Sequence, residues 1–120
     1  MKSLVALRLV AAAHAAAICL QPVLAGVYLD GTGGAQRIHQ PVGLAVALIA
    51  MLQLLITTIW WRLGGTVIAP LVCVLLLVGE TFQIAMGFTR QMTLHIPLGI
   101  ALVGAGVAFA VWTHRQQAIS

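Results

Sequence analysis

Two histidines occupy the same short sequence pattern, and their side chains are the strongest candidates for chemistry in this chain. The segments His39-Gln40-Pro41-Val42-Gly43 and His95-Ile96-Pro97-Leu98-Gly99 share the form His-x-Pro-x-Gly, and each opens a long apolar segment. A neutral imidazole nitrogen is a common metal ligand. Equivalent histidines on two parallel helices can approach one metal from opposite sides. The repeat therefore predicts that His39 and His95 bind one flat metal cofactor between them.

Residues near the histidines suit haem as that cofactor. Gly43 and Gly99 lie one helical turn beyond the histidines, on the same helix face, and leave room for a planar ring. Arg37 and Arg90 lie just outside them, where a guanidinium can bind a propionate through two charged hydrogen bonds. Small residues also let membrane helices approach closely, and basic residues also anchor helix ends at the interface. Both readings stay open for these four residues.

The prolines of the two patterns suit the first turn of a helix, where the missing N–H has no intrahelical partner.

The chain has no CxxCH motif, so covalent c-type attachment is excluded and haem b is expected. Two axial nitrogens fill the coordination of iron. We therefore expect one-electron transfer or haem handling rather than oxygen chemistry.

A second pair of chemically capable residues lies within the apolar segments. His14 and Glu80 are each about ten residues from the same end of their segments, which places both near the middle of a membrane. An ionisable group there usually faces the bundle interior with a partner. We expect a His14–Glu80 hydrogen bond, either as a proton site or as a polar contact that sets helix register.

Composition indicates what positions these residues. The chain has 120 residues, of which 62% are hydrophobic and 7% charged, and its mean hydropathy is +1.09. These values are typical of membrane proteins. Four apolar stretches are each near the ~20 residues that cross a bilayer, and segments this apolar are expected to be helices. They are approximately Leu4–Leu29, Val42–Trp61, Val67–Phe88 and Leu94–Trp112.

Charge sets the expected orientation. The formal net charge is +4, but the basic residues are scattered at segment ends, which argues against nucleic-acid binding. More of them lie on the side of the termini, so the positive-inside rule predicts a multi-pass plasma-membrane protein with both termini in the cytoplasm. Three tryptophans on that side are expected in an interfacial aromatic belt. They are Trp60, Trp61 and Trp112.

The chain divides into two similar halves. The segment 20–26, Leu-Gln-Pro-Val-Leu-Ala-Gly, resembles 82–87, Phe-Gln-Ile-Ala-Met-Gly, and each precedes its own His-x-Pro-x-Gly. Short connections at about 30–36, 62–65 and 89–93 favour an up-down four-helix bundle. We therefore predict one all-α transmembrane domain, residues 1–120, made of two repeated helical hairpins at about 4–62 and 66–114. A pseudo-two-fold axis along the membrane normal would relate them.

This arrangement resembles one four-helix half of the haem A synthase family, whose halves carry haem-ligating histidines on their second and fourth helices. His39 and His95 match those positions, and the segments 83–87 and 95–99 resemble the last two helices of a half. The resemblance implies a haem-binding membrane cytochrome. A glutamate of the family's catalytic half is Gln36 here, so the resemblance does not carry over haem oxidation, and enzyme activity stays uncertain.

Two other functions remain open. The chain could be a cofactor-free accessory subunit of a larger membrane complex, or a copper or other metal-binding membrane protein that uses the same histidines. Two imidazoles are a sparse set for copper or zinc, which usually take three or four protein ligands. For the cytochrome, the expected partners are the lipid bilayer, a quinol or respiratory-chain redox partner, and a second copy of the chain in a homodimer.

Overall fold

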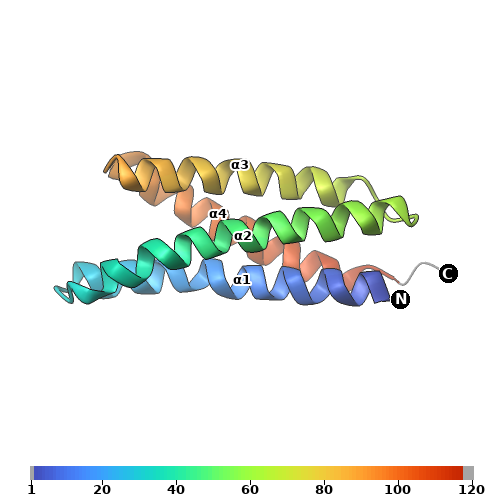
Figure 1. The fold of residues 1–120 in the computed structure, drawn as a ribbon, viewed down its shortest axis with the longest axis horizontal. Helices are drawn as coiled ribbons and strands as arrows, with labels where there is room; N and C mark the ends of the chain where they lie inside the picture. The colour runs from blue at the N-terminus through green and yellow to red at the C-terminus, as the bar shows by residue number, and fades with distance from the viewer. Residues whose placement is uncertain (1, 118–120) are drawn as a thin grey trace.

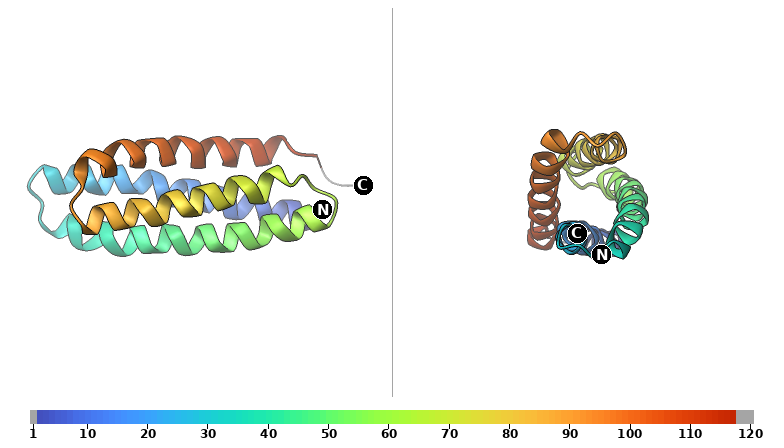
Figure 2. Two further views of the ribbon diagram at one scale, coloured as in Figure 1. Left: turned by 90° about the horizontal axis from the view of Figure 1, so that it is seen from above. Right: turned by 90° about the vertical axis from the view of Figure 1, so that its left-hand side faces the viewer.

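Four long helices dominate the computed structural model, which describes residues 2–117. They are α1 (Lys2–Leu29), α2 (Gly34–Arg62), α3 (Ile68–Phe88) and α4 (Met92–Arg115), and they run up and down in chain order (Figure 1). Each helix packs on its two neighbours in the order α1, α2, α3, α4, so α1 lies diagonal to α3 and α2 to α4 (Figure 2). The described residues include no strand. The predicted all-α four-helix bundle is confirmed.

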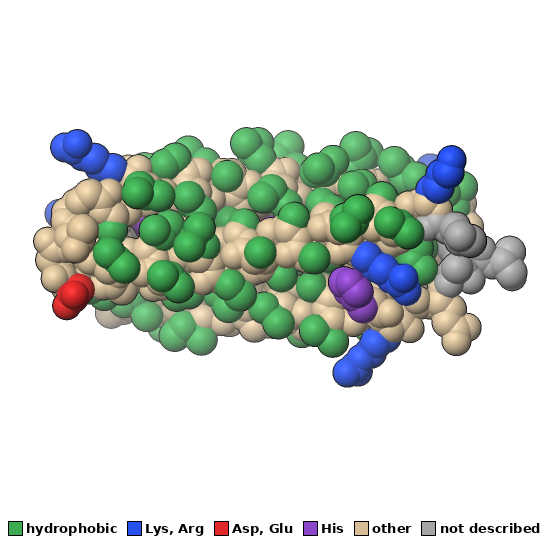
Figure 3. All heavy atoms as spheres, turned by 90° about the horizontal axis from the view of Figure 1, so that it is seen from below, with side chains coloured by type: hydrophobic (Ala, Val, Ile, Leu, Met, Phe, Trp, Pro, Cys, Tyr) green, Lys and Arg blue, Asp and Glu red, His purple; other side chains and the backbone are tan. Residues whose placement is uncertain are grey.

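Every helix is long and apolar enough to cross a membrane, as the hydropathy predicts. The molecule measures 53 × 20 × 19 Å, and on the face drawn in Figure 3 hydrophobic side chains cover the middle while basic side chains lie toward the two ends. Since lipid cannot hydrogen-bond to the backbone, helices satisfy their polar groups internally. Helical threonines follow the same rule: Thr57 and Thr81 donate to Gln53 and Leu77 carbonyl oxygens.

The bundle has two distinct ends. We call the end with the connections 30–33 and 89–91 the hairpin end. The terminal end carries the connection 63–67, the start of α1 and the end of α4. At the terminal end Arg8 of α1 donates to the carbonyl oxygens of Thr113 and Gln116, at 3.3 and 2.7 Å, and so binds carbonyl groups in and just after the last turn of α4.

Two helices begin earlier than the apolar stretches indicate. Helix α2 starts at Gly34 and α4 at Met92, so Pro41 lies at the start of the third turn of α2 and Pro97 in the second turn of α4. The prediction that these prolines occupy the first turn is therefore wrong. Hydropathy marks only the apolar part of a helix, whereas helical hydrogen bonding continues through the polar residues that precede it.

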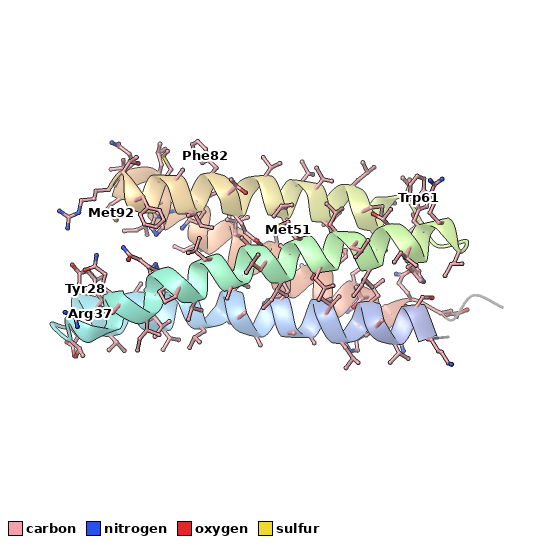
Figure 4. All side chains as sticks on the ribbon, in the orientation of Figure 1. Tyr28, Arg37, Met51, Trp61, Phe82 and Met92 are labelled. Atoms are coloured by element: carbon pink, nitrogen blue, oxygen red, sulfur yellow. The ribbon has the colours of Figure 1, made fainter. Side chains whose placement is uncertain are left out.

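Trp60 also departs from the sequence prediction. It is 2% exposed, packs edge-on against Trp112 with ring centroids 6.3 Å apart, and is covered by the backbone of Gly65. It is a core residue rather than part of an interfacial belt. Trp61 is 37% exposed at the terminal end and does lie on the surface (Figure 4). Which of two adjacent tryptophans faces inward depends on the rotation of α2, which the sequence pattern left undetermined.

Nearly all buried side chains of the described residues lie in the part of the bundle nearer the terminal end. The buried residues closest to the hairpin end on the four helices are Ile18, Val46, Glu80 and Leu102, with the sole exception of Ala35. We call residues 19–45 and 81–101 the hairpin-end section. In Figure 1 the two hairpins diverge toward this end. Protein interiors are normally close-packed and contain buried side chains from every helix that lines them. In the hairpin-end section only Ala35 is buried among the described residues, so this section lacks a core of its own.

Candidate functional site

The two repeated histidines face each other across the bundle within the hairpin-end section. His39 comes from α2 and His95 from α4, which are diagonal helices, and their ring centroids are 6.2 Å apart at an angle of 69°. Both side chains are half-buried. The structure therefore brings together the two imidazoles that the sequence repeat singled out.

His95 is held by the backbone of α3. Its Nδ1 donates to the carbonyl oxygen of Gln83 at 2.8 Å, and a carbonyl can only accept. Nδ1 thus carries the hydrogen, and the lone pair of Nε2 is available for a metal. Such a second hydrogen bond orients many metal-binding histidines. Gly87 lies directly against the ring, where a Cβ atom would be 2.9 Å from His95 Cε1.

His39 is held by a side chain of α1. With the Gln21 amide oxygen accepting from Gly43 N–H at 2.6 Å, the amide nitrogen lies 2.7 Å from His39 Nδ1. An amide has both a donor and an acceptor end. In this orientation the amide nitrogen donates to Nδ1, so a neutral His39 carries its hydrogen on Nε2. Turning the amide over would set its NH2 group against the N–H of Gly43. A metal at His39 Nε2 therefore requires His39 to change tautomer and Gln21 to reorient.

The glycines of the two patterns lie against these glutamines. A Cβ atom on Gly99 would be 2.7 Å from Gln83 Nε2, and one on Gly43 would be 3.6 Å from Gln21 Nε2. The space beside each glycine thus holds a glutamine side chain. Sequence reasoning noted that Gln21 and Gln83 repeat but did not connect them to the histidines. The signal was present, because each glutamine stands on the helix that precedes its histidine.

Arg37 and Arg90 lie at the hairpin end and are exposed. Figure 4 shows both Arg37 and Tyr28 at this end of the molecule. Within residues 2–117 the structure gives neither guanidinium a hydrogen-bonded or ionic partner. Arg90 has φ of 58°, a left-handed conformation that few non-glycine residues adopt. Both arginines are free to bind an anionic group near the histidines.

His14 and Glu80 meet on the other diagonal of the bundle. His14 Nε2 lies 2.7 Å from Glu80 Oε1, and the two side chains are 1% and 4% exposed. Glu80 Oε2 is buried and has no hydrogen-bond donor within the described chain. This pair forms the buried layer that borders the hairpin-end section, on the side of the terminal end.

The histidine pair supplies the donor chemistry that an iron porphyrin would need, two imidazoles with their ring centroids 6.2 Å apart. A metal bound at about 2 Å from each imidazole nitrogen holds the two ring centres roughly 6 Å apart, close to the 6.2 Å found between His39 and His95. The surrounding section is the one whose own side chains form no buried core. Residues 2–117 contain no group of three or more histidine, cysteine or acidic side chains that could hold a metal ion.

Comparison with known proteins adds no further assignment, because no family model, curated protein or solved structure matches this chain.

Proposed function

We propose that this protein is a membrane cytochrome that binds one haem b non-covalently between His39 and His95 and serves one-electron transfer or haem handling. The observation that carries the proposal is the pair of imidazoles, with ring centroids 6.2 Å apart, in the section of the bundle that lacks its own core. A bound macrocycle would supply the apolar contacts missing there.

Each residue of the site has a definite part in this proposal. His95 offers Nε2, because Gln83 holds its Nδ1. Gln21 donates to His39 Nδ1, so His39 would offer Nε2 only after its hydrogen moves to Nδ1 and the Gln21 amide oxygen turns toward it. Arg37 and Arg90 would pair with the propionates. Haem supplies reversible one-electron chemistry at its iron, and two axial imidazoles favour electron transfer over oxygen activation.

The resemblance to one half of the haem A synthases leads to the same ligand pair. Gln36 lacks the carboxylate of the family's catalytic half, so we propose haem binding without oxidation of the haem. The positive-inside rule favours a cytoplasmic terminal end, which carries Lys2, Arg8, Arg62 and Arg115. In a plasma membrane this orientation puts the haem near the outer face, within reach of a quinol or respiratory-chain donor. A homodimer would recreate the eight-helix size of that family.

An optical spectrum of the purified protein tests the proposal. We expect a reduced-minus-oxidised spectrum with the bands of low-spin haem b and about one haem per chain. His39→Ala and His95→Ala should each abolish these bands or convert them to a high-spin form, since one axial ligand is lost. His114→Ala is the matched control, because His114 is exposed at the terminal end, and its spectrum should not change.

Two outcomes would contradict the proposal. A protein without haem bands after expression with added haem would favour the accessory-subunit alternative, and metal analysis of the same sample would reveal copper. Haem bands that persist in both histidine variants would mean that haem binds elsewhere.

A further inference from the structure

The His14–Glu80 pair has features that the proposed cytochrome function does not use. Both side chains are almost completely buried, they come from the diagonal helices α1 and α3, and they are 2.7 Å apart. Gly106 of α4 lies beside them, since a Cβ atom there would be in van der Waals contact with His14 Cε1 at 4.0 Å. An ionisable pair in the middle of a membrane is costly and usually functional.

Few other charges act on this pair. Cys73 of α3 lies two turns from Glu80 toward the terminal end and is held by Gln53 Nε2 at 3.4 Å. Cys19 of α1 lies five residues from His14, toward the hairpin end. The other titratable or charged residues of the four helices lie nearer the helix ends. On α1 they are Lys2, Arg8 and Tyr28; on α2, Arg37, His39 and Arg62; on α4, His95, His114 and Arg115. The charge state of the pair is therefore set mainly by His14 and Glu80 themselves and by whatever charge the neighbouring site holds.

That site is one helical turn away. Gln83 follows Glu80 by three residues on α3, a rise of about 5 Å, and the carbonyl oxygen of Gln83 holds His95 Nδ1. Glu80 Oε2 and Gln83 Oε1 are both buried without a hydrogen-bond donor among the described residues. Two unpaired acceptors in this position can be satisfied by a bound water or by a proton on the carboxyl group.

We propose that the His14–Glu80 pair is a proton-binding site coupled to the redox state of the haem. The inference rests on the proposed function. Reduction of a bound ferric haem by an external one-electron donor would lower the positive charge near His95 by one. In the low dielectric of the bundle this change favours a proton on the nearby pair. One electron from the donor and one proton from water thus enter together, and both leave on oxidation.

The test is the pH dependence of the midpoint potential of the haem-loaded protein. We expect the wild-type potential to fall with rising pH, with a slope that approaches about 59 mV per pH unit, the value for one proton per electron. Glu80→Gln keeps the size of the side chain and a polar oxygen beside His14 but removes the titrating carboxyl group, so the slope should become nearly flat. Asp30→Asn is the matched control, because Asp30 is the other acid of the chain, and it should keep the wild-type slope.

A second readout does not depend on the potential. The reduced-minus-oxidised infrared spectrum should contain a band of the protonated carboxyl group that Glu80→Gln removes and Asp30→Asn retains. If Glu80→Gln fails to fold, Glu80→Leu serves instead, since it also removes the carboxyl group and should flatten the slope in the same way. An equal slope in wild type and the variant, with no such infrared band, would overturn the inference, whereas the absence of haem from the wild-type protein would overturn the proposed function instead.

Discussion

His39 and His95 stand in the same sequence pattern, yet different kinds of groups hold them. The backbone carbonyl of Gln83 accepts from His95 Nδ1, whereas His39 Nδ1 contacts the side-chain amide of Gln21. Substitution of Gln83 leaves its backbone carbonyl in place, whereas substitution of Gln21 removes the side-chain amide that contacts His39. The two histidines should therefore differ in how they respond to mutation of their glutamines.

Replacing Gln21 by leucine should weaken haem binding by about 10- to 100-fold, the usual effect of removing a group that orients a metal ligand. Gln83→Leu should weaken it much less, because the carbonyl that holds His95 remains. Titration of the haem-free protein with haem measures both affinities. Gln40→Leu, an exposed glutamine beside His39, is the control. Equal losses in the Gln21 and Gln83 variants would show that side-chain support does not distinguish the two ligands.

At the scale of elements, the first three helices end in the same way. After α1, α2 and α3 a residue with positive φ closes the last turn. Its own N–H and that of the next residue bond back to helix carbonyls, as in the Schellman motif. The residues with positive φ are Gly31, Gly64 and Arg90. Glycine adopts this conformation at no steric cost, whereas a side chain there costs roughly 1–2 kcal/mol. Strain of this kind is often found at functional sites.

Arg90→Gly should therefore separate the two roles of this residue. Relief of strain and the greater freedom of glycine in the unfolded chain oppose each other, so the unfolding free energy of the haem-free protein should change by less than about 1 kcal/mol. Haem affinity should fall roughly fivefold, which corresponds to the loss of an exposed ion pair worth about 1 kcal/mol. Denaturant unfolding and haem titration measure the two quantities. Arg115→Gly at the terminal end should leave the affinity unchanged, and an unchanged affinity in Arg90→Gly would exclude a propionate contact.

At the scale of the whole molecule, the bundle consists of a packed part and the hairpin-end section. In the packed part all four helices contribute buried apolar side chains, such as Leu7, Ala50, Leu76 and Phe109. In the hairpin-end section only Ala35 is buried among the described residues. Regions with few buried contacts open more readily than the core, and a ligand that binds only the folded state stabilises it.

Hydrogen exchange of the haem-free protein should therefore be fastest in the hairpin-end section, residues 19–45 and 81–101, and slower in 46–60 and 102–113. Addition of haem should slow exchange mainly in the hairpin-end section. Mass spectrometry of the protein in one detergent, with and without haem, measures both effects, and His39→Ala in the presence of haem is the control. Uniform protection of the haem-free protein would contradict the division into two parts.

Much of the fold was predictable from the sequence because its cause is local. A bilayer leaves the backbone no hydrogen-bonding partner, so each apolar stretch of about 20 residues must be a helix. Short connections between such stretches give an up-down bundle. The repeated pattern identified His39 and His95, and helical depth put His14 and Glu80 at one level of the membrane. These inferences need only residue type and spacing along the chain.

The tertiary structure alone decided what each side chain faces. It buried Trp60 but not Trp61, set the glutamines of α1 and α3 against the histidines of α2 and α4, and left the hairpin-end section without a core. It also extended α2 and α4 beyond their apolar stretches and put Arg90 in a left-handed turn. The rotation and crossing of a helix result from packing against its neighbours along its whole length. No local pattern encodes that cooperative outcome, because every contact in it joins residues from different helices.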